Sequence, residues 1–300
     1  MVTVAGEAMN GAISSILTAP GGPEDRPTVG DWLLIDRESQ HPVRILDRTS
    51  LFKRPAPGDE RRIQLIAANV DTLFVVTSCD QDFNVARIER YLVLAGDVGV
   101  RPVVVLTKSD LSGDTRTYVA ALRAIEPMLR VEAVNGLDPE SVAGLAAYCG
   151  AGETVALVGS SGVGKSTLIG TLTGCRDIAT QPVRESDGKG LHTTTVRQMH
   201  RLDGGGWLVD TPGMRELQMS EVAAGVAEVF DDIVATTLEC RFTDCSHADE
   251  PGCAIRAAGR DGTIEPARLE RWRKLTSENL LNSRNAAIRR NRQARPGKRT

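Results

Sequence analysis

Residues 154–173 read TVALVGSSGVGKSTLIGTLT, and this stretch decides how the rest of the chain is interpreted. Thr154 to Val158 is an apolar, β-branched run, which is typical of a strand buried on both faces. The residues that follow fit the spacing G-x-x-x-x-G-K-[ST], and a helical pattern begins directly after them. In such a loop, backbone N–H groups and the N-terminus of the helix surround a phosphate. The sequence therefore predicts a nucleotide-binding loop, in which Lys165 reaches the β- and γ-phosphates and the Ser166 hydroxyl holds Mg²⁺.

Length and composition limit the classes of protein to consider. The chain has 300 residues, of which 41% are hydrophobic and 25% charged, as in a globular protein of two or three domains. No apolar run approaches the roughly 20 residues that cross a bilayer, and the N-terminus lacks a secretory signal pattern. Three of the six cysteines are clustered, which favours metal binding in a reducing cytosol over a disulfide framework. We expect a cytoplasmic protein that works as a monomer and has no membrane partner.

Three domains are expected along the chain. Residues 1–65 carry short alternating runs at 12–17, 31–35 and 43–46, separated by Gly/Pro turns, and they suggest a small and incomplete β barrel. In residues 66–220 strands alternate with helices, which indicates a mostly parallel α/β sheet. Residues 221–300 form a third region. The expected elements are strands at 72–77, 102–106 and 154–158, helices at 85–98, 115–125, 139–148 and 265–275, and a hairpin at 198–209.

A candidate base-reading motif, Thr107-Lys108-Ser109-Asp110, follows the expected strand at 102–106. The Asp110 carboxylate can accept from both the N1–H and the N2 amino group of guanine, a donor pair that adenine lacks. The stem of Lys108 can lie flat against the base. This motif precedes the phosphate loop, which is the reverse of the order in ordinary GTPases. Because ligand-binding loops meet at the carboxyl edge of a parallel sheet whatever their order, we interpret the chain as circularly permuted.

A third candidate element is Asp210-Thr211-Pro212-Gly213, which follows an apolar strand. Asp210 can orient a Mg²⁺-bound water, and the Gly213 N–H can sense the γ-phosphate. Upstream, Thr194 or one of its neighbours Thr193 and Thr195 offers a hydroxyl to the same ion. His192 directly precedes these threonines and can approach the attacking water, although a surface histidine without a role is about equally compatible with the sequence.

A metal site is predicted near the C-terminus from the spacing Cys240-x₄-Cys245-x-His247-x₅-Cys253. Three thiolates and one imidazole can enclose a single tetrahedral Zn²⁺ and leave no position for a catalytic water, so the expected role is structural. Beyond Glu278 the charged residues are all basic, which suggests a polyanionic partner or only a solvated tail. These residues are Arg284, Arg289, Arg290, Arg292, Arg295, Lys298 and Arg299.

Together with five further stretches, these motifs resemble the ribosome small-subunit-dependent GTPase A family. The stretches are VGDW at 29–32, AANVD at 67–71, FNVARIERYL at 83–92, GKGLHTTT at 188–195 and CRFTDCSHADEPGCAIR at 240–256. The resemblance covers most of the chain. It implies an N-terminal OB-type barrel, a circularly permuted P-loop GTPase domain and a C-terminal zinc-containing helical domain. It also implies binding to the small ribosomal subunit and its rRNA late in assembly, with GTP hydrolysis stimulated by the ribosome.

Carried onto this chain, the resemblance implies one structural Zn²⁺ on the cluster above, Mg²⁺ with GTP, and two sets of nucleotide contacts. The guanine contacts are Thr107, Lys108, Ser109 and Asp110. The phosphate contacts are Gly159, Ser160, Ser161, Gly162, Val163, Gly164, Lys165, Ser166 and Thr167.

The chain departs from the family pattern in three places. It starts near GEAMNG, where family members usually have further barrel strands, so we expect a barrel short of strands. Thr107 stands where the family usually has Asn, which predicts retained guanine selection with weaker anchoring of the loop. The usual Ser-Ala-Lys base loop is reduced to Glu132-Ala133-Val134. Two other functions remain open at this point: a P-loop ATPase or small-molecule kinase, and a non-catalytic RNA-binding module in which nucleotide only stabilises the fold.

Overall fold

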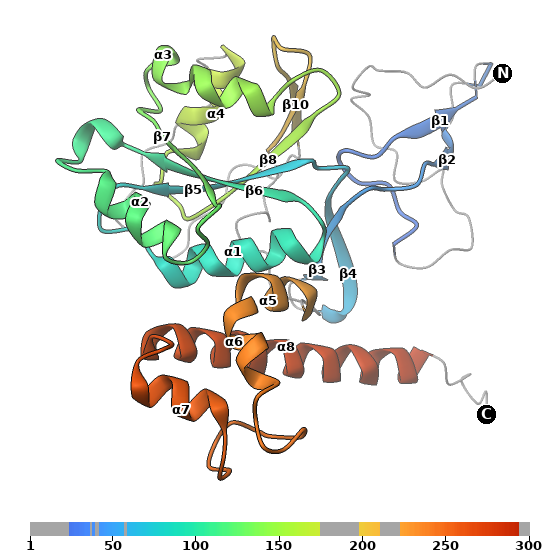
Figure 1. Cartoon of the computed structure of the whole chain (residues 1–300). Coiled ribbons are helices and arrows are strands. Elements are labelled where there is room, and N and C mark those ends of the chain that lie inside the picture. Colours follow the sequence, from blue (N-terminus) through green and yellow to red (C-terminus); the bar gives the residue numbers. More distant parts are fainter. Residues whose placement is uncertain are drawn as a thin grey trace, which may run out of the picture. The chain divides into compact units, whose positions relative to one another are not determined.

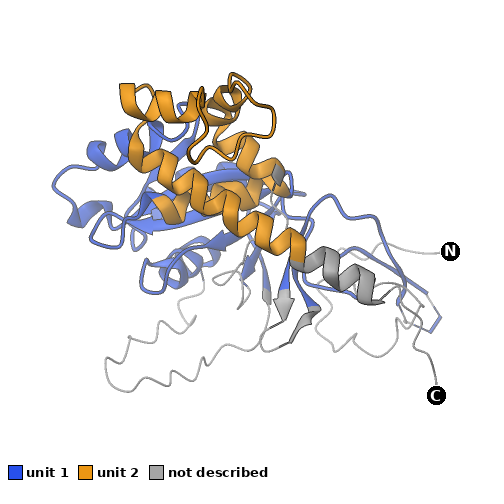
Figure 2. Cartoon of the chain, turned by 90° about the horizontal axis from the view of Figure 1, so that it is seen from below, with its two compact units in different colours: residues 1–85, 98–218 blue, residues 86–97, 219–300 orange. Residues whose placement is uncertain are grey.

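The computed structural model describes residues 24–36, 38–39, 42–56, 59–174, 198–210 and 223–293. The chain divides into two compact units, which Figure 2 shows in different colours. Unit 1 comprises residues 1–85 and 98–218, and unit 2 comprises residues 86–97 and 219–300. A single helix of the α/β region, at 86–97, is thus grouped with the C-terminal region.

Unit 1 is built on a six-stranded sheet with the order β7-β6-β5-β8-β10-β9 (Figure 1). All neighbouring strands are parallel except β9 and β10, which form an antiparallel hairpin. The strands are β5 (Thr72–Ser78), β6 (Arg101–Thr107), β7 (Arg130–Ala133), β8 (Thr154–Val158), β9 (Gln198–Arg201) and β10 (Trp207–Asp210). Because β5, β6, β7, β8 and β10 run the same way, their carboxyl ends lie at one edge of the sheet.

The sheet is buried because the middle of each central strand is apolar; β5 and β8 are buried throughout. One face, with Phe74, Val105 and Leu157 among its residues, packs in a single cluster with Leu145 and Leu168. The helices of this unit are η2 (Ser109–Leu111), α2 (Arg116–Arg123), α3 (Pro139–Val142), η3 (Ala143–Tyr148) and α4 (Lys165–Thr173). In Figure 1, α3 and α4 lie on one side of the sheet and α2 on the other.

Before the sheet, the described strands form two separate antiparallel pairs. The first pair is β1 (Leu33–Ile35) with β2 (Pro42–Ile45), and the second is β3 (Leu51–Ala56) with β4 (Asp59–Ala68). The expected strand at 12–17 lies outside the described residues, so the OB-type barrel stays a prediction. The sequence did not predict β3 and β4 because Pro55 and the charged residues of this hairpin hide the alternation that marks a strand.

Unit 2 is helical. It contains residues 86–97 of α1 (Val85–Asp97), together with α5 (Ala223–Val229), α6 (Asp231–Thr237), α7 (Ala254–Asp261) and α8 (Pro266–Gln293). α1 and α5 approach closely at Gly225, where a Cβ would lie 1.9 Å from the carbonyl oxygen of Val93. α8 buries Leu269, Trp272 and Leu275, the stripe that the sequence predicts.

Two helices differ from the sequence prediction. α8 extends to Gln293 rather than ending near residue 275, because no glycine or proline interrupts it between Ala267 and Gln293. The helix expected at 139–148 is α-helical only over its first four residues and continues as the 3₁₀ helix η3. β7, which the sequence prediction left out, is a four-residue edge strand paired with β6.

Candidate functional site

The phosphate loop connects β8 to α4 at the carboxyl edge of the sheet, as the sequence predicts. Its backbone needs glycine: Gly159, Gly162 and Gly164 have φ angles of 143°, 82° and 93°. At Gly159 the loop also passes so close to β5 that a Cβ would lie 2.1 Å from the carbonyl oxygen of Val76. Any side chain at this position would displace the loop from the sheet.

Lys165, the first residue of α4, is buried with its ammonium turned into the loop. Its Nζ donates to the carbonyl oxygens of Gly159, at 2.7 Å, and Ser160. A positive charge is therefore held inside the turn that precedes the helix, where the N-terminal end of the helix dipole adds to it. Such a cradle is suited to the phosphates of a nucleotide.

The candidate base-reading motif is tied directly to this loop. Thr107 is buried at the end of β6, and its hydroxyl donates to the carbonyl oxygen of Val163 at 2.5 Å. The backbone N–H of Ser109 donates to the carbonyl oxygen of Val134 at 3.3 Å, so the motif also contacts the loop after β7. Thr107 stands where the family usually has Asn, and its hydroxyl thus keeps one hydrogen bond to the phosphate loop.

Lys108 and Asp110 are more exposed than this buried anchor. Lys108 has φ 56° and ψ 32°, a left-handed backbone conformation, and it precedes the 3₁₀ turn η2 that contains the exposed Asp110. The Lys108 ammonium contacts the Asp80 carboxylate at 2.9 Å. Asp80, in the loop that follows β5, is a residue that the sequence reasoning missed. Its only signal is an acidic side chain just beyond the carboxyl end of a buried strand.

Strand β7 and the loop that follows it are held by side chains from two helices. The Thr171 hydroxyl of α4 donates to the carbonyl oxygen of Gly136 at 2.7 Å. The Tyr148 hydroxyl donates to Glu132 at 2.9 Å, and burial followed by this contact raises the pKa of Tyr148. Glu132 and Ala133 of the reduced base loop thus belong to β7, and Gly136 in the following loop is tied to α4.

Asp210 is the last residue of β10, the strand that pairs with β8, so it ends at the same edge as the phosphate loop. Ser166, in the first turn of α4, and Asp210 supply the kind of oxygen ligands that suit Mg²⁺. His192, Thr193, Thr194, Thr195 and Gly213 lie outside the described residues.

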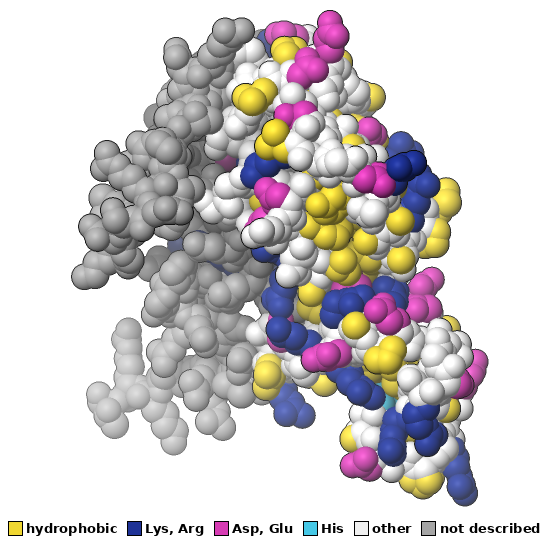
Figure 3. Space-filling view, turned by 90° about the vertical axis from the view of Figure 1, so that its left-hand side faces the viewer, with side chains coloured by type: hydrophobic (Ala, Val, Ile, Leu, Met, Phe, Trp, Pro, Cys, Tyr) yellow, Lys and Arg dark blue, Asp and Glu magenta, His cyan; other side chains and the backbone are white. Residues whose placement is uncertain are grey.

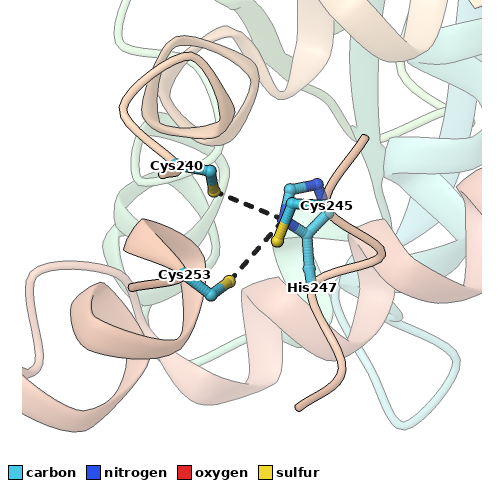
Figure 4. A group of neighbouring side chains, drawn as sticks. All are labelled: Cys240, Cys245, His247 and Cys253. Carbon is cyan, nitrogen blue, oxygen red and sulfur yellow. Dashed lines mark hydrogen bonds between the residues drawn. The ribbon is translucent and has the colours of Figure 1, made fainter. Parts of the chain in front are cut away.

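The four predicted zinc ligands come together in unit 2, in the loop between α6 and α7 (Figure 4). Their ligand atoms lie within 4.8 Å of one another. The His247 Nδ1 is 3.6 Å from the Cys240 Sγ and 3.7 Å from the Cys253 Sγ. Zn–S and Zn–N bonds of about 2.3 and 2.0 Å place tetrahedral ligands about 3.5 Å apart, so the cluster fits one Zn²⁺.

The surrounding residues hold this cluster in place. Glu250 accepts backbone hydrogen bonds from Ser246 at 2.8 Å and Ala248 at 3.0 Å, which closes the loop around His247. The His247 ring lies against Trp272 of α8. Burial lowers the pKa of His247, which favours the neutral imidazole that a metal requires.

Basic and acidic side chains are interspersed over the coloured, described part of the face drawn in Figure 3, so this part does not form a field of one sign. Of the basic C-terminal residues, only the side chain of Arg284 is described, and it is exposed. Among the helices that the structure describes, none is both long and apolar enough to span a bilayer.

Comparison with known proteins agrees with the permuted arrangement. The family described as "RsgA GTPase" matches residues 45–220. "Small ribosomal subunit biogenesis GTPase RsgA 2" from Vibrio parahaemolyticus is 48% identical over 273 residues, which cover 91% of this chain and 76% of that protein. "Small ribosomal subunit biogenesis GTPase RsgA" from Mesorhizobium japonicum is 50% identical over 258 residues, covering 85% and 74%.

Two solved structures share the fold. YjeQ from Thermotoga maritima matches with a TM-score of 0.61 and 27% identity, over 85% of each chain. YloQ, described as a circularly permuted GTPase, matches with a TM-score of 0.59 over 84% of this chain and 80% of its own, and its 24% identity supports the fold alone. This chain is therefore a member of the RsgA GTPase family.

Proposed function

We propose that this chain binds GTP, hydrolyses it to GDP and phosphate, and through this cycle assists late maturation of the small ribosomal subunit, which stimulates the hydrolysis. Family membership and the printed names of the relatives support this role. The observation that carries the proposal is the direct contact between the Thr107 hydroxyl and the Val163 carbonyl oxygen. This contact joins a base-reading motif and a phosphate loop into one site, although 56 residues separate them.

Guanine is the base that this site suits. Asp110 offers an exposed carboxylate at the turn held by Thr107 and Ser109. Binding adenine would leave that carboxylate without the N1–H and N2 donors of guanine, which disfavours the wrong base. We therefore place the base at η2 and the phosphates over Gly159 to Thr167.

For the chemistry, the backbone of the phosphate loop and the Lys165 ammonium stabilise the negative charge of the transferred phosphoryl group. Ser166 and Asp210, with Thr194 proposed as a third ligand, would hold Mg²⁺, which neutralises charge on the β- and γ-phosphate oxygens. Met214 follows Gly213 in the sequence and cannot orient water, so we propose His192 for that task, with the Gly213 N–H sensing the γ-phosphate. All of these groups come from one chain, and we propose that the protein acts as a monomer in the cytoplasm.

Zinc has a structural role in this proposal. Three thiolates and one imidazole fill a tetrahedral shell, and no position remains for a reacting water. The ion would hold the loop between α6 and α7, and we propose that the unit it stabilises contacts rRNA together with the basic C-terminal residues.

The test is GTP hydrolysis by the full chain, with and without purified small ribosomal subunits, and with large subunits as the control. Small subunits should raise turnover, and ATP should compete with GTP much more weakly than GDP does. Equal competition by ATP would favour an ATPase or small-molecule kinase. If the Lys165→Ala variant binds small subunits as well as the wild type does, and GTP analogues change neither affinity, the chain is a non-catalytic RNA-binding module.

A further inference from the structure

The loops that follow β5 and β6 leave the sheet side by side. The two strands are parallel and in register to their last residues, where Ser78 pairs with Thr107. One residue further, the backbone N–H of Cys79 donates to the carbonyl oxygen of Thr107 at 2.9 Å. Asp80 and Lys108 therefore emerge next to each other at the carboxyl edge.

Asp80 is held in one orientation by three donors. Its Oδ1 accepts from the Ser78 hydroxyl at 2.6 Å and from the backbone N–H of Asp82 at 2.9 Å. Its Oδ2 is left to face the Lys108 ammonium at 2.9 Å. The Ser78 hydroxyl first, and the Asp82 N–H and Lys108 after it, hold the pKa of Asp80 at about 2, so the carboxylate stays charged at neutral pH.

The position of this contact matters because of the strand order β6-β5-β8. A nucleotide that joins the base-reading motif after β6 to the phosphate loop after β8 must cross the end of β5 between them. The Lys108 side chain starts at the end of β6, and its ammonium is held by Asp80 at the end of β5. Its stem therefore runs along the path that the base and sugar would follow.

We propose that Asp80 is a positioning residue for guanine nucleotides: by holding the Lys108 ammonium, it fixes the lysine stem as a flat support for the base that Asp110 reads. This inference rests on the proposed function, because it needs guanine to occupy the site. Asp80 does not touch the nucleotide in this arrangement; it acts through Lys108.

The ion pair contributes little to the stability of the fold. Its role in positioning Lys108 can therefore be tested separately from any role in folding. The side chains of Lys108 and Asp80 are 36% and 40% exposed, and ion pairs at such positions are worth little to folding. Their value lies in ordering a long, flexible side chain before the ligand arrives, because a side chain that is ordered only on binding weakens the affinity.

The test compares Asp80→Asn with the wild type in the full chain. Asparagine keeps an oxygen for Ser78 and for the Asp82 N–H but loses the charge that faces Lys108. We expect GDP affinity, measured by titration with fluorescent GDP, to fall about 3- to 10-fold, and the KM for GTP to rise by a similar factor with kcat nearly unchanged. Unfolding by urea should be unaltered.

Asp114→Asn is the matched control, because Asp114 forms a comparable exposed ion pair with Arg116 at 2.9 Å outside the site. It should leave GDP affinity at the wild-type value. A double-mutant cycle with Lys108→Met gives the decisive readout: in that background Asp80→Asn should have no further effect on affinity.

Two results would overturn the inference: wild-type GDP affinity in Asp80→Asn, or equal losses from Asp80→Asn with and without Lys108→Met. Failure of the proposed function is distinguishable, because the wild type itself would then bind ADP as tightly as GDP.

Discussion

Glu89 offers a sharp test of how unit 2 is held together. It lies on α1 and is fully buried, yet its neighbours on α8 are charged. Its Oε2 accepts from the Arg271 Nε at 2.6 Å, and its Oε1 from the Arg268 Nη1 at 3.4 Å. Burial raises the pKa of Glu89, and the two arginines oppose that rise. The substitution Glu89→Ala removes the carboxylate on which both arginines converge.

The expected loss in the free energy of unfolding depends on the contacts that the two arginines retain. Removing one partner of a buried ion pair costs about 3–5 kcal/mol, because the other charge stays buried without compensation. Arg268 retains Asp232 at 2.8 Å and the carbonyl oxygen of Val229 at 2.9 Å. The side chain of Arg271 is 21% exposed and can reach water. We therefore expect a loss at the lower end of this range, about 3 kcal/mol in the free energy of unfolding.

The assay is urea unfolding followed by the fluorescence of Trp272, which is buried on α8. The other tryptophans, Trp32 and Trp207, are replaced by Phe so that only unit 2 is observed. Glu270→Ala, at an exposed position of α8, is the control and should change the free energy of unfolding by less than about 0.5 kcal/mol. Glu89→Gln should be milder than Glu89→Ala, because the amide fills the same volume and its oxygen can still accept a hydrogen bond from one arginine.

A loss from Glu89→Ala below about 1 kcal/mol, or one equal to that of Glu270→Ala, would refute this reasoning. It would mean that Glu89 behaves as an exposed side chain and that the arginines of α8 do not depend on it. A loss well above about 5 kcal/mol would instead indicate that α1 no longer packs in unit 2 at all.

Four further outcomes are expected. His192→Ala should lower subunit-stimulated turnover about 10²-fold with GDP affinity near normal; unchanged stimulated turnover would exclude His192 from the reaction. Gly159→Ala should weaken GDP binding more than about 10-fold in the same titration, because its Cβ would collide with the Val76 carbonyl oxygen. Elemental analysis should give one Zn²⁺ per chain, and a strong chelator should reduce helical circular dichroism while GDP binding is retained. Deleting residues 284–300 should flatten the dependence of small-subunit affinity on salt; an unchanged slope would make this segment only a solvated tail.

Local patterns predicted the centre of unit 1 well. The strand at 154–158 appears where the sequence places it, and the helix begins at Lys165, two residues earlier than predicted. Both are found from the sequence because a continuous apolar run and a glycine loop each have a local physical cause. Permutation did not disturb the prediction, because each strand is recognised from its own residues and pairing is set by the sheet.

The features that were not predicted from the sequence depend on contacts outside their own stretch of the chain. The β3–β4 hairpin has register shifts at Phe52/Lys53 and Pro55/Ala56, which break the two-residue alternation. β7 has only four residues and no apolar run, and it forms because β6 leaves an edge to pair with. Glu89 is a buried acidic residue, and its partners among the described residues, Arg268 and Arg271, lie about 180 residues away in the sequence.

Asp80 shows why the candidate site was predicted only in part. Motifs find residues that touch a ligand, because the ligand dictates their type and spacing. Residues that orient those groups depend instead on which strand lies beside them. Asp80 contacts Lys108 because β5 and β6 end in register, and the sequence of neither stretch indicates this pairing. In a permuted sheet, the neighbours of each ligand-binding loop must therefore be taken from the strand order. The order β6-β5-β8 puts the loop after β5 between the two motifs, where a nucleotide bound as proposed would cross it.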